Sequence, residues 1–353
     1  MDAIHEQIVC PCSAGHPRND HQLIFPLRDD RLMLVWCEYY ITRPSLILPR
    51  DPATGGTRDA APCRISAKVS DDRGRSWSDT FTLQDNTGRD NVKHPCLVRL
   101  PDGEVLLFFT EWNALDDRRI LMRRSSDDCE TWGESERISS LDGFHCLNND
   151  HALRLSTGRV VVPTHRGEFY GKGDHFQAFC YFSDDNGETW RHSGTRMDLP
   201  KRGAEEPSIV ELGDGSLLAV MRTSLGAVYR SRSTDRGENW SEPESTGLEA
   251  PASPPLLKRI PSMGDLLLVW NHNVDPDHHH QGERNPLSSA ISKDGGETWG
   301  HIRNIEDREG WGCAYAAVTF VGDEALVTYY HGSLVEQTSS VKLKILPIEW
   351  FYQ

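Results

Sequence analysis

The sequence predicts an all-β fold, a six-bladed β-propeller built from residues 1–353 as a single domain. Two repeats predict this fold: a short turn motif that occurs five times, and a strand, turn and strand pattern that occurs six times. Helical periodicity of any length is absent from the sequence, which argues against a separate α/β domain. A chain of this length, with 37% hydrophobic residues, is long enough to bury one large core.

The turn motif reads S-x-D-x-G-x-x-W, and its copies begin 50 to 59 residues apart, at Ser70, Ser125, Ser183, Ser233 and Ser292. Only the second copy departs from the pattern, with Cys129 in place of Gly. The Ser and Asp side chains can bond the amides of a turn, Gly adopts a backbone conformation that other residues resist, and Trp packs beneath. A turn closed on its own side chains is a structural element, and its spacing is typical of propeller blades.

The second repeat lies between these motifs and predicts a β-meander in each unit. Apolar strands flank a turn in six segments: residues 23–40, 95–112, 152–167, 207–224, 256–273 and 316–332. The last unit has no turn motif of its own, but residues 341–351 supply a further strand. We expect residues 3–9 to pair with this last blade and close the ring, because closure removes the exposed edges of an open sheet.

Composition excludes several classes of partner. The formal charge of -15 disfavours nucleic acid and anionic membrane surfaces as partners. The sequence shows neither a secretory signal nor an apolar run long enough to span a membrane, so we expect a soluble, cytoplasmic protein. Nine cysteines without an export signal predict reduced thiols, and the Cys10–Cys12 pair has no second pair at zinc-ligand spacing. We therefore expect no cofactor.

Alignment of the six meanders on their turns predicts which residues face the axis. Because the first strand of a blade lines the axis, residues at its start share one pocket. Nine positions before each turn stand His21, His94, Asn149, Glu206, Pro255 and Tyr315. Seven positions after each turn, on the second strands, stand Cys37, Thr110, His165, Arg222, Asn271 and His331. Arg222 lies in an apolar run where a charge is costly without a partner, so we expect it to reach the pocket.

With these repeats and polar positions, the chain resembles the sialidase superfamily over nearly its whole length. That family places a glutamate at the start of a central blade and an arginine at the end of the next strand, which correspond to Glu206 and Arg222. A second arginine before a late turn motif corresponds to Arg284, and a tyrosine that opens the last blade corresponds to Tyr315. The family's acid/base aspartate lies in the loop before the first motif. Asp59 is our candidate there, with Asp51 as the alternative.

The first blade departs from the family's pattern. Sialidases begin this blade with an arginine followed by Ile and Pro, which completes three arginines around the substrate carboxylate. Here Arg18 lies two to three residues out of register. The expected place is taken by Asp20 or His21, and the same Asn-Asp-His run recurs in the third blade. We expect a histidine-rich pocket edge formed by Asp20, His21, His94, Asp150, His151 and His165, with Asn271 beside it. Two retained arginines predict an enzyme for acidic sugars that turns over sialic acid poorly.

The resemblance implies an exo-acting, retaining glycosidase. In such an enzyme Tyr315, deprotonated with help from Glu206, attacks the anomeric carbon while Asp59 protonates the departing oxygen. Arg222 and Arg284 would hold the substrate carboxylate through paired hydrogen bonds. We expect the side chains of Glu206 and Tyr315 to approach within hydrogen-bonding distance.

Two other functions fit the same residues. One is a lyase or hydrolase of uronic-acid glycans, in which a histidine and Tyr315 exchange protons. The other is a glycan-binding propeller without turnover, because a fold alone does not prove chemistry. The run Asp275, Asp277, His278, His279 and His280, with His272, does not predict a metal site, since consecutive histidines on a loop cannot all face one ion. The expected partner in every case is an acidic carbohydrate.

Overall fold

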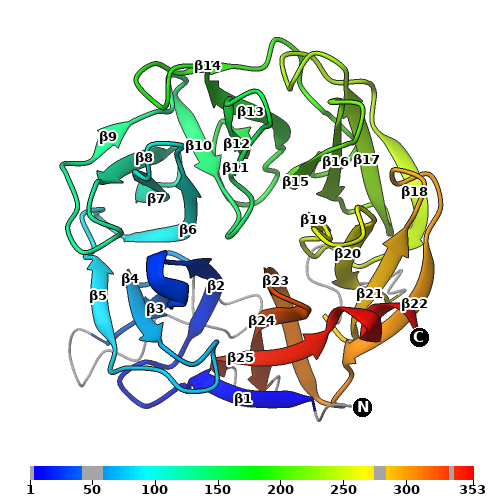
Figure 1. Ribbon diagram of the computed structural model, residues 1–353. Helices are drawn as coiled ribbons and strands as arrows, with labels where there is room; N and C mark the ends of the chain where they lie inside the picture. Colours follow the sequence, from blue (N-terminus) through cyan, green and yellow to red (C-terminus); the bar gives the residue numbers. More distant parts are fainter. Residues whose placement is uncertain (1–3, 42–58, 274–283, 334–337) are drawn as a thin grey trace.

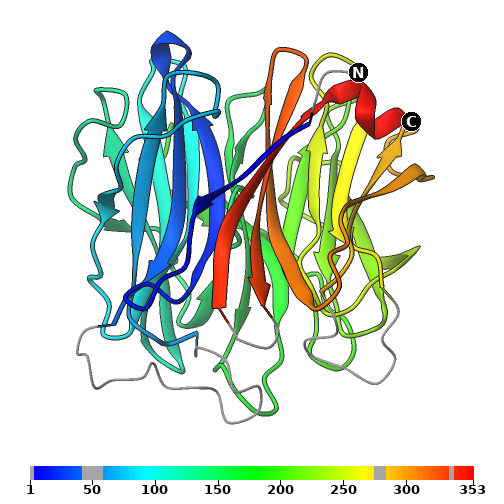
Figure 2. The same ribbon diagram turned by 90° about the horizontal axis from the view of Figure 1, so that it is seen from below.

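The computed structural model describes residues 4–41, 59–273, 284–333 and 338–353. The strands form sheets arranged in a ring around a central axis (Figure 1). In the side view of Figure 2 the strands run roughly along that axis. The predicted all-β arrangement of the propeller type is confirmed. Besides strands, the described residues form two short 3₁₀ helices, η1 (Arg28–Asp30) and η2 (Ile348–Tyr352), and contain no helix long and apolar enough to cross a membrane.

Four separate sheets have four strands each. The first contains β2 (Asn19–Pro26), β3 (Leu32–Tyr39), β4 (Cys63–Ser70) and β5 (Phe81–Gln84). The next contains β15 (Glu205–Glu211), β16 (Leu217–Arg222), β17 (Ala227–Ser233) and β18 (Glu244–Glu249). The third contains β19 (Leu256–Arg259), β20 (Leu266–Asn271), β21 (Leu287–Ser292) and β22 (Gly300–Glu306). The last contains β23 (Trp311–Val321), β24 (Glu324–Ser333), β25 (Thr338–Pro347) and β1 (His5–Cys10).

A fifth, nine-stranded sheet holds the strands of the second and third sequence repeats. Its first part contains β6 (Asn91–Arg99), β7 (Val105–Ala114), β8 (Asp117–Ser125) and β9 (Glu136–Arg137). Its second part contains β10 (Gly143–Cys146), β11 (Leu153–Arg154), β12 (Val160–Gly167), β13 (Gln177–Ser183) and β14 (Arg191–His192). The parts join because β10 pairs parallel with β8 and antiparallel with β12.

The two ends of the described chain share one sheet. Strand β1 pairs antiparallel with β25, with His5 opposite Ile345. Figures 1 and 2 show β1 alongside β25 at the outer side of the ring. Strand β25 in turn pairs with β24, so the first and last strands of the described chain lie in the same sheet.

The five turn motifs close on their own side chains. In the first, Ser70 donates to Asp72 (2.9 Å) and accepts from the amide of Gly74 (2.8 Å), while Asp72 accepts from the amide of Ser76 (2.7 Å). Gly74 has φ +85°, and Cys129, at the equivalent place in the second motif, adopts a similar φ of +75°. The motif therefore requires a left-handed residue even where Gly is absent.

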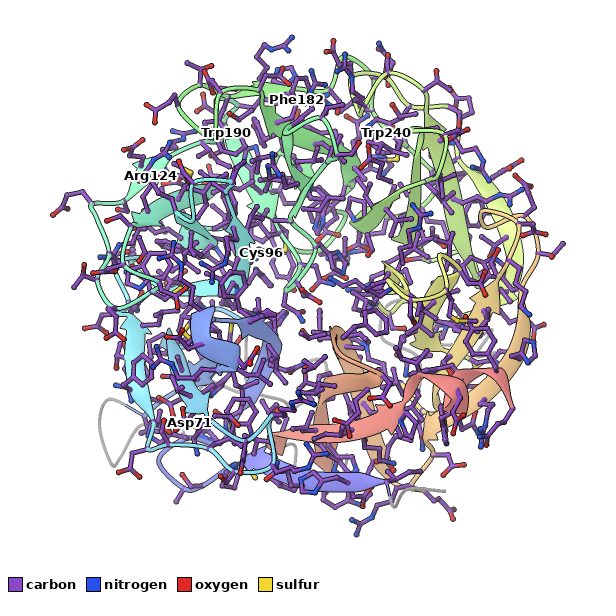
Figure 3. The ribbon with its side chains drawn as sticks, in the orientation of Figure 1. Asp71, Cys96, Arg124, Phe182, Trp190 and Trp240 are labelled. Atoms are coloured by element: carbon purple, nitrogen blue, oxygen red, sulfur yellow. The ribbon has the colours of Figure 1, made fainter. Side chains whose placement is uncertain are left out.

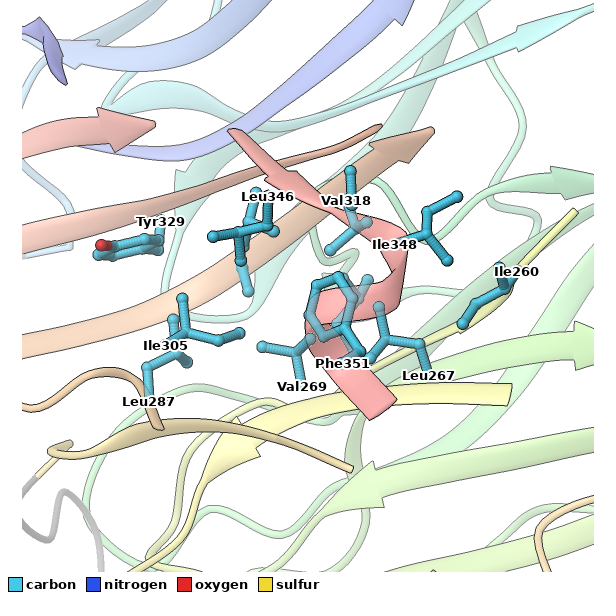
Figure 4. Packing of buried hydrophobic residues seen from close by; sticks show 14 of the residues in the cluster. Ile260, Leu267, Val269, Leu287, Ile305, Val318, Tyr329, Leu346, Ile348 and Phe351 are labelled. Atoms are coloured by element: carbon cyan, nitrogen blue, oxygen red, sulfur yellow. The ribbon is translucent and has the colours of Figure 1, made fainter. Parts of the chain in front are cut away.

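Hydrophobic cores lie between neighbouring sheets. Side chains from β19 to β24 and from η2 meet in one of them, where Phe351 is fully buried against residues such as Leu267 and Val269 (Figure 4). The turn-motif tryptophans Trp190 and Trp240 lie towards the outside of the ring, whereas Cys96 of β6 lies nearer the axis (Figure 3). All nine cysteines lie in the described part of the chain, and none of them is paired in a disulfide there.

Candidate functional site

Four innermost strands share one irregularity near their starts. Strands β2, β6, β15 and β23 each contain a bulge that interrupts the pairing with the next strand. Within each bulge one residue has a positive φ: His21 (+49°), His94 (+60°), Glu206 (+48°) and Tyr315 (+54°). A bulge residue leaves the strand ladder and re-aims its side chain. These are four of the six positions that the internal alignment placed at the pocket; in the third unit the left-handed residue is Asp150, one position later than Asn149.

Tyr315 lies at the centre of a compact polar group. The rings of His21 and Tyr315 are 4.0 Å apart between centroids, and His94 lies 4.3 Å from His21. The guanidinium carbon of Arg284 lies 5.3 Å from the centroid of the Tyr315 ring. The backbone carbonyl of Tyr315 accepts hydrogen bonds from Gln22 and Asn149, which come from other units of the ring. The fold therefore holds Tyr315 near the axis from several directions.

Glu206 is fixed by its neighbours. Arg222 donates to the Glu206 carboxylate at 3.0 Å, and the amide of Glu206 donates to Nδ1 of His165 at 3.0 Å. Burial raises the pKa of Glu206, but Arg222, His165 and Arg284 outweigh burial and hold that pKa at about 2. Glu206 is therefore an anion at neutral pH.

Tyr315 is protonated at neutral pH, since burial and then the Glu206 charge raise its pKa, while Arg284 and Arg222 oppose this rise. The two side chains are thus coupled electrostatically. Among the described residues, however, Glu206 is hydrogen-bonded to Arg222, and no direct hydrogen bond joins it to the Tyr315 hydroxyl. The closer approach expected from the sequence is absent here.

A second group surrounds Asp59. Arg18 donates through Nε to Asp20 (2.5 Å) and pairs through Nη1 with Asp59 (2.9 Å). The ammonium of Lys93 lies 3.4 Å from Asp59, and the hydroxyl of Tyr170 donates to Asp59 at 3.2 Å. Burial opposes ionisation of Asp59, but the charges of Lys93 and Arg18 prevail and hold its pKa well below the ordinary value. Asp59 is therefore an anion in the free protein.

The two groups are continuous. Asp20 bonds Nδ1 of His21 at 2.6 Å, and this contact overcomes burial and raises the pKa of His21. Burial raises the pKa of Tyr330, and the charges of Arg284 and Arg18 both oppose this rise. Besides fully buried members, the two groups contain half-buried residues that solvent can reach: Arg18, Asp59, Tyr170, Arg284, Tyr315 and Tyr330. Together they form one site at the axis with both acidic and basic groups.

The remaining predicted residues lie apart from Tyr315 or support the site. Asp150 pairs with Lys258 at 2.8 Å, and with His151 it lines a separate cavity of about 280 Å³ between β11, β15 and β19. His151 is buried, which lowers its pKa to about 3. The amide nitrogen of Asn271 donates to backbone carbonyls of Pro286 and Cys313, a structural role. Asp51 and residues 278–280 lie outside the described residues.

One set of side chains has the spacing of a metal site. Ligand atoms of Asp20, His21 and Cys37 lie within 4.8 Å of one another, and all three residues are buried. Arg18 already bonds Asp20, and Lys93 is close enough to lower the pKa of His21. These cations would repel a metal ion, so the set fits an ion pair between Asp20 and a protonated His21 better than a cation site.

Several residues of the site were not identified from the sequence. Lys93 is 2% exposed and next to His94 in an apolar strand. Like Arg222, it is a charged residue in an apolar run, and the sequence alone could therefore have indicated that it needs a partner. Glu205 pairs with Arg202 and Arg222, beside Glu206. Tyr170 follows β12 in an irregular segment, and no sequence pattern indicated that it would reach Asp59. Arg118 is 3% exposed and bonded to His94 at 2.8 Å, and no sequence pattern indicated this contact either.

Comparisons with known proteins agree with this architecture. The sequence matches the family described as "BNR repeat-like domain" over residues 53–331. It is 31% identical over 140 residues to the anhydrosialidase of Macrobdella decora, covering 37% of this chain and 17% of that protein. It is 26% identical over 242 residues to the sialidase of Paraclostridium sordellii, covering 58% of each. The chain thus spans less than two thirds of the length of these curated relatives.

The solved structure of a leech intramolecular trans-sialidase, in complex with 2,7-anhydro-Neu5Ac, is similar with a TM-score of 0.75. The two sequences are 14% identical over 98% of this chain and 70% of the leech chain. At this level of identity the similarity shows a common fold and leaves the chemistry to the site residues.

Proposed function

Because the chain belongs to the BNR repeat-like family within the sialidase superfamily, we propose that it is a retaining, exo-acting glycoside hydrolase of an acidic sugar, sialic acid or a relative. The relatives named above are sialidases, and the substrate class follows from the cations around Tyr315. We also propose that the nine-stranded sheet counts as two blades joined by β10, which makes six blades with the four separate sheets.

One observation carries the proposal: Arg284 and Arg222 lie beside the Tyr315 and Glu206 pair. Arg284 is 5.3 Å from the Tyr315 ring, and Arg222 bonds Glu206 at 3.0 Å. An arginine is always charged and pairs with a carboxylate through two parallel bonds, so these side chains suit an anionic sugar held close to Tyr315. A neutral tyrosine approaches such a sugar without the repulsion that a carboxylate nucleophile would meet.

The proposed reaction proceeds in two steps. The Tyr315 oxygen attacks the anomeric carbon and passes its proton to Glu206, while the bond to the departing group breaks and Asp59 donates a proton to that oxygen. The oxygen of a water molecule then attacks the anomeric carbon, whose bond to the Tyr315 oxygen breaks; the water gives a proton to Asp59, and Glu206 returns a proton to Tyr315. For this, Glu206 must come closer to the Tyr315 hydroxyl than in the free protein, and a substrate carboxylate that draws Arg222 away from Glu206 would permit it.

A second candidate is supported by the histidines. His21 lies against the Tyr315 ring, and burial together with the Arg118 charge keeps the pKa of the adjacent His94 well below its ordinary value. A neutral His94 and Tyr315 could serve as base and acid in elimination from a uronic-acid glycan. Elimination would give an unsaturated product, whereas hydrolysis gives a saturated sugar, so product analysis separates the two functions.

The deciding experiment measures turnover of a sialoside and of uronic-acid glycosides by the wild type and by Arg284→Ala. We expect hydrolysis of at least one acidic glycoside, and a 10- to 100-fold lower kcat/KM for Arg284→Ala, since a charge-assisted bond contributes about 1.5–3 kcal/mol. Arg191→Ala, which removes a 60% exposed arginine on the outer strand β14, is the matched control and should match the wild type. No turnover of any acidic glycoside, or activity indifferent to Arg284, would contradict the proposal.

A further inference from the structure

Arg18 is held by two carboxylates that differ in their surroundings. The side chain of Asp20, near the start of β2, is 2% exposed and bonds the Nε atom of Arg18. Asp59, whose side chain is 39% exposed, pairs with the Nη1 atom at 2.9 Å. The Arg18 side chain is itself 19% exposed and lies with its guanidinium carbon 4.5 Å from the ring centroid of Tyr39. The Asp20 carboxylate is therefore shielded from solvent, and the pair with Asp59 is the one that a solute can reach.

Asp59 is held by side chains from three different segments of the chain. One of its oxygens faces both Arg18 and Lys93, and the other accepts a bond from Tyr170. Lys93 is 2% exposed and lies 5.3 Å from the Tyr39 ring centroid, so a buried cation is maintained there. A simple surface ion pair joins one cation to one carboxylate, whereas the half-exposed carboxylate of Asp59 contacts two cations and a hydroxyl.

We propose that Asp59 occupies, in the free protein, the place on Arg18 that the carboxylate of an acidic substrate takes, so that the substrate must displace it. Lys93 is then the positioning residue that retains the displaced Asp59 beside the departing oxygen. This inference rests on the proposed function, because it assigns the third cation for the substrate carboxylate. It also gives a reason why Arg18, out of register with the family's pattern, still belongs to the site.

Displacement couples binding to proton uptake. The charged and titratable groups that act on Asp59 are Arg18, Lys93, His21, Tyr39, Tyr170 and Tyr315. Arg18 is one of the two cations that hold the pKa of Asp59 down, so this pKa rises when a substrate carboxylate neutralises Arg18, and proton uptake becomes easier. The proton comes from solvent. An acidic substrate would therefore prepare its own general acid, whereas a neutral sugar would leave Asp59 ionised.

The test compares the binding of free acids and of their neutral methyl esters. The probes are N-acetylneuraminic acid, glucuronic acid and galacturonic acid, measured by titration calorimetry at pH 7 with the wild type, Asp59→Asn and the control Asp71→Asn. Asp71 is exposed on an outer turn (Figure 3) and tests for a general charge effect. We expect at least one acid to bind Asp59→Asn about tenfold more tightly than the other two proteins, because its competitor on Arg18 is gone. The methyl esters should not distinguish the three proteins.

Equal or weaker binding of every acid to Asp59→Asn, or no binding to either protein, would overturn the proposal. Asp59→Ser serves as a second variant if Asp59→Asn unfolds, as judged by thermal unfolding. Turnover separates this inference from the proposed function. If Asp59→Asn binds an acid more tightly but the wild type hydrolyses none of its glycosides, the displacement stands and the hydrolase assignment fails. If the wild type hydrolyses such a glycoside while binding is unchanged in Asp59→Asn, the reverse holds.

Discussion

The outer turns and the inner strand starts of this molecule both contain residues with a positive φ, but they use them differently. Each outer turn has two consecutive left-handed residues, the second of which is glycine in four of the five turns, as in Gly74 and Gly187, and the polar groups around them bond within eight residues of sequence. At the inner ends the left-handed residues include His21, Glu206 and Tyr315, and each of these is contacted by a residue from another strand.

This difference separates a scaffold from a site. A glycine adopts the left-handed conformation at little cost, whereas a histidine, glutamate or tyrosine in that conformation is strained by about 1–3 kcal/mol and persists only where its surroundings hold it. The outer turns can therefore form locally. The inner bulges depend on the completed ring, and each of them presents a polar side chain of the candidate site.

The largest expected effect would come from Tyr315→Phe, which deletes only the hydroxyl group of Tyr315 in the site and leaves the outer turns unchanged. If Tyr315 is the nucleophile, kcat should fall by at least a thousandfold, while the free energy of unfolding changes by less than about 1 kcal/mol. Steady-state kinetics and urea unfolding measure the two quantities. Tyr330→Phe is the matched control, since its ring lies 6.1 Å from that of Tyr315, and it should lower kcat/KM no more than about tenfold. Comparable losses in both variants would argue against Tyr315 as the nucleophile.

A smaller effect, on stability and not on turnover, is expected for Ser183→Ala in the third turn motif. The Ser183 hydroxyl is buried, accepts from the amide of Gly187 at 2.7 Å and donates to Asp185 at 2.7 Å. Its loss leaves a buried amide without a partner, so the free energy of unfolding should fall by about 1–3 kcal/mol with kcat/KM unchanged. The exposed Ser135→Ala provides the control in urea unfolding. A change in kcat/KM at 25 °C would contradict the idea that the outer turns affect stability without affecting the site.

The smallest expected effect is a shift in pH dependence for Lys93→Met. The proposed general acid Asp59 is active only when protonated, and it loses its proton as pH rises through its pKa. The profile of kcat against pH should therefore fall on its alkaline side. Removing the Lys93 charge raises the pKa of Asp59, so this alkaline limb of the profile should move to higher pH. The pH profile of kcat measures it. If Lys93 were merely structural, kcat would fall at every pH and the limb would stay in place.

The repeats in the sequence predicted most of the architecture because each turn motif is specified by neighbours. Ser70, Asp72 and Gly74 bond one another, so their spacing alone indicates the turn. The apolar strands between the motifs alternate with short turns, which predicts meanders. The parallel pairing of β10 with β8, which merges two repeats into one sheet, had no such local signature, since it depends on how neighbouring units meet.

For the site, the sequence by itself determined which residues stand at equivalent positions in the repeats. Counting from the turns paired Glu206 with Arg222 and His94 with Thr110, and both pairs are in contact. Only the tertiary structure decided the long-range contacts: Lys93 and Arg18 meet Asp59, and Tyr170 completes its shell from a segment 111 residues away. The physical reason is that charges buried at the axis must find partners across the ring, and those partners have no fixed spacing in the sequence.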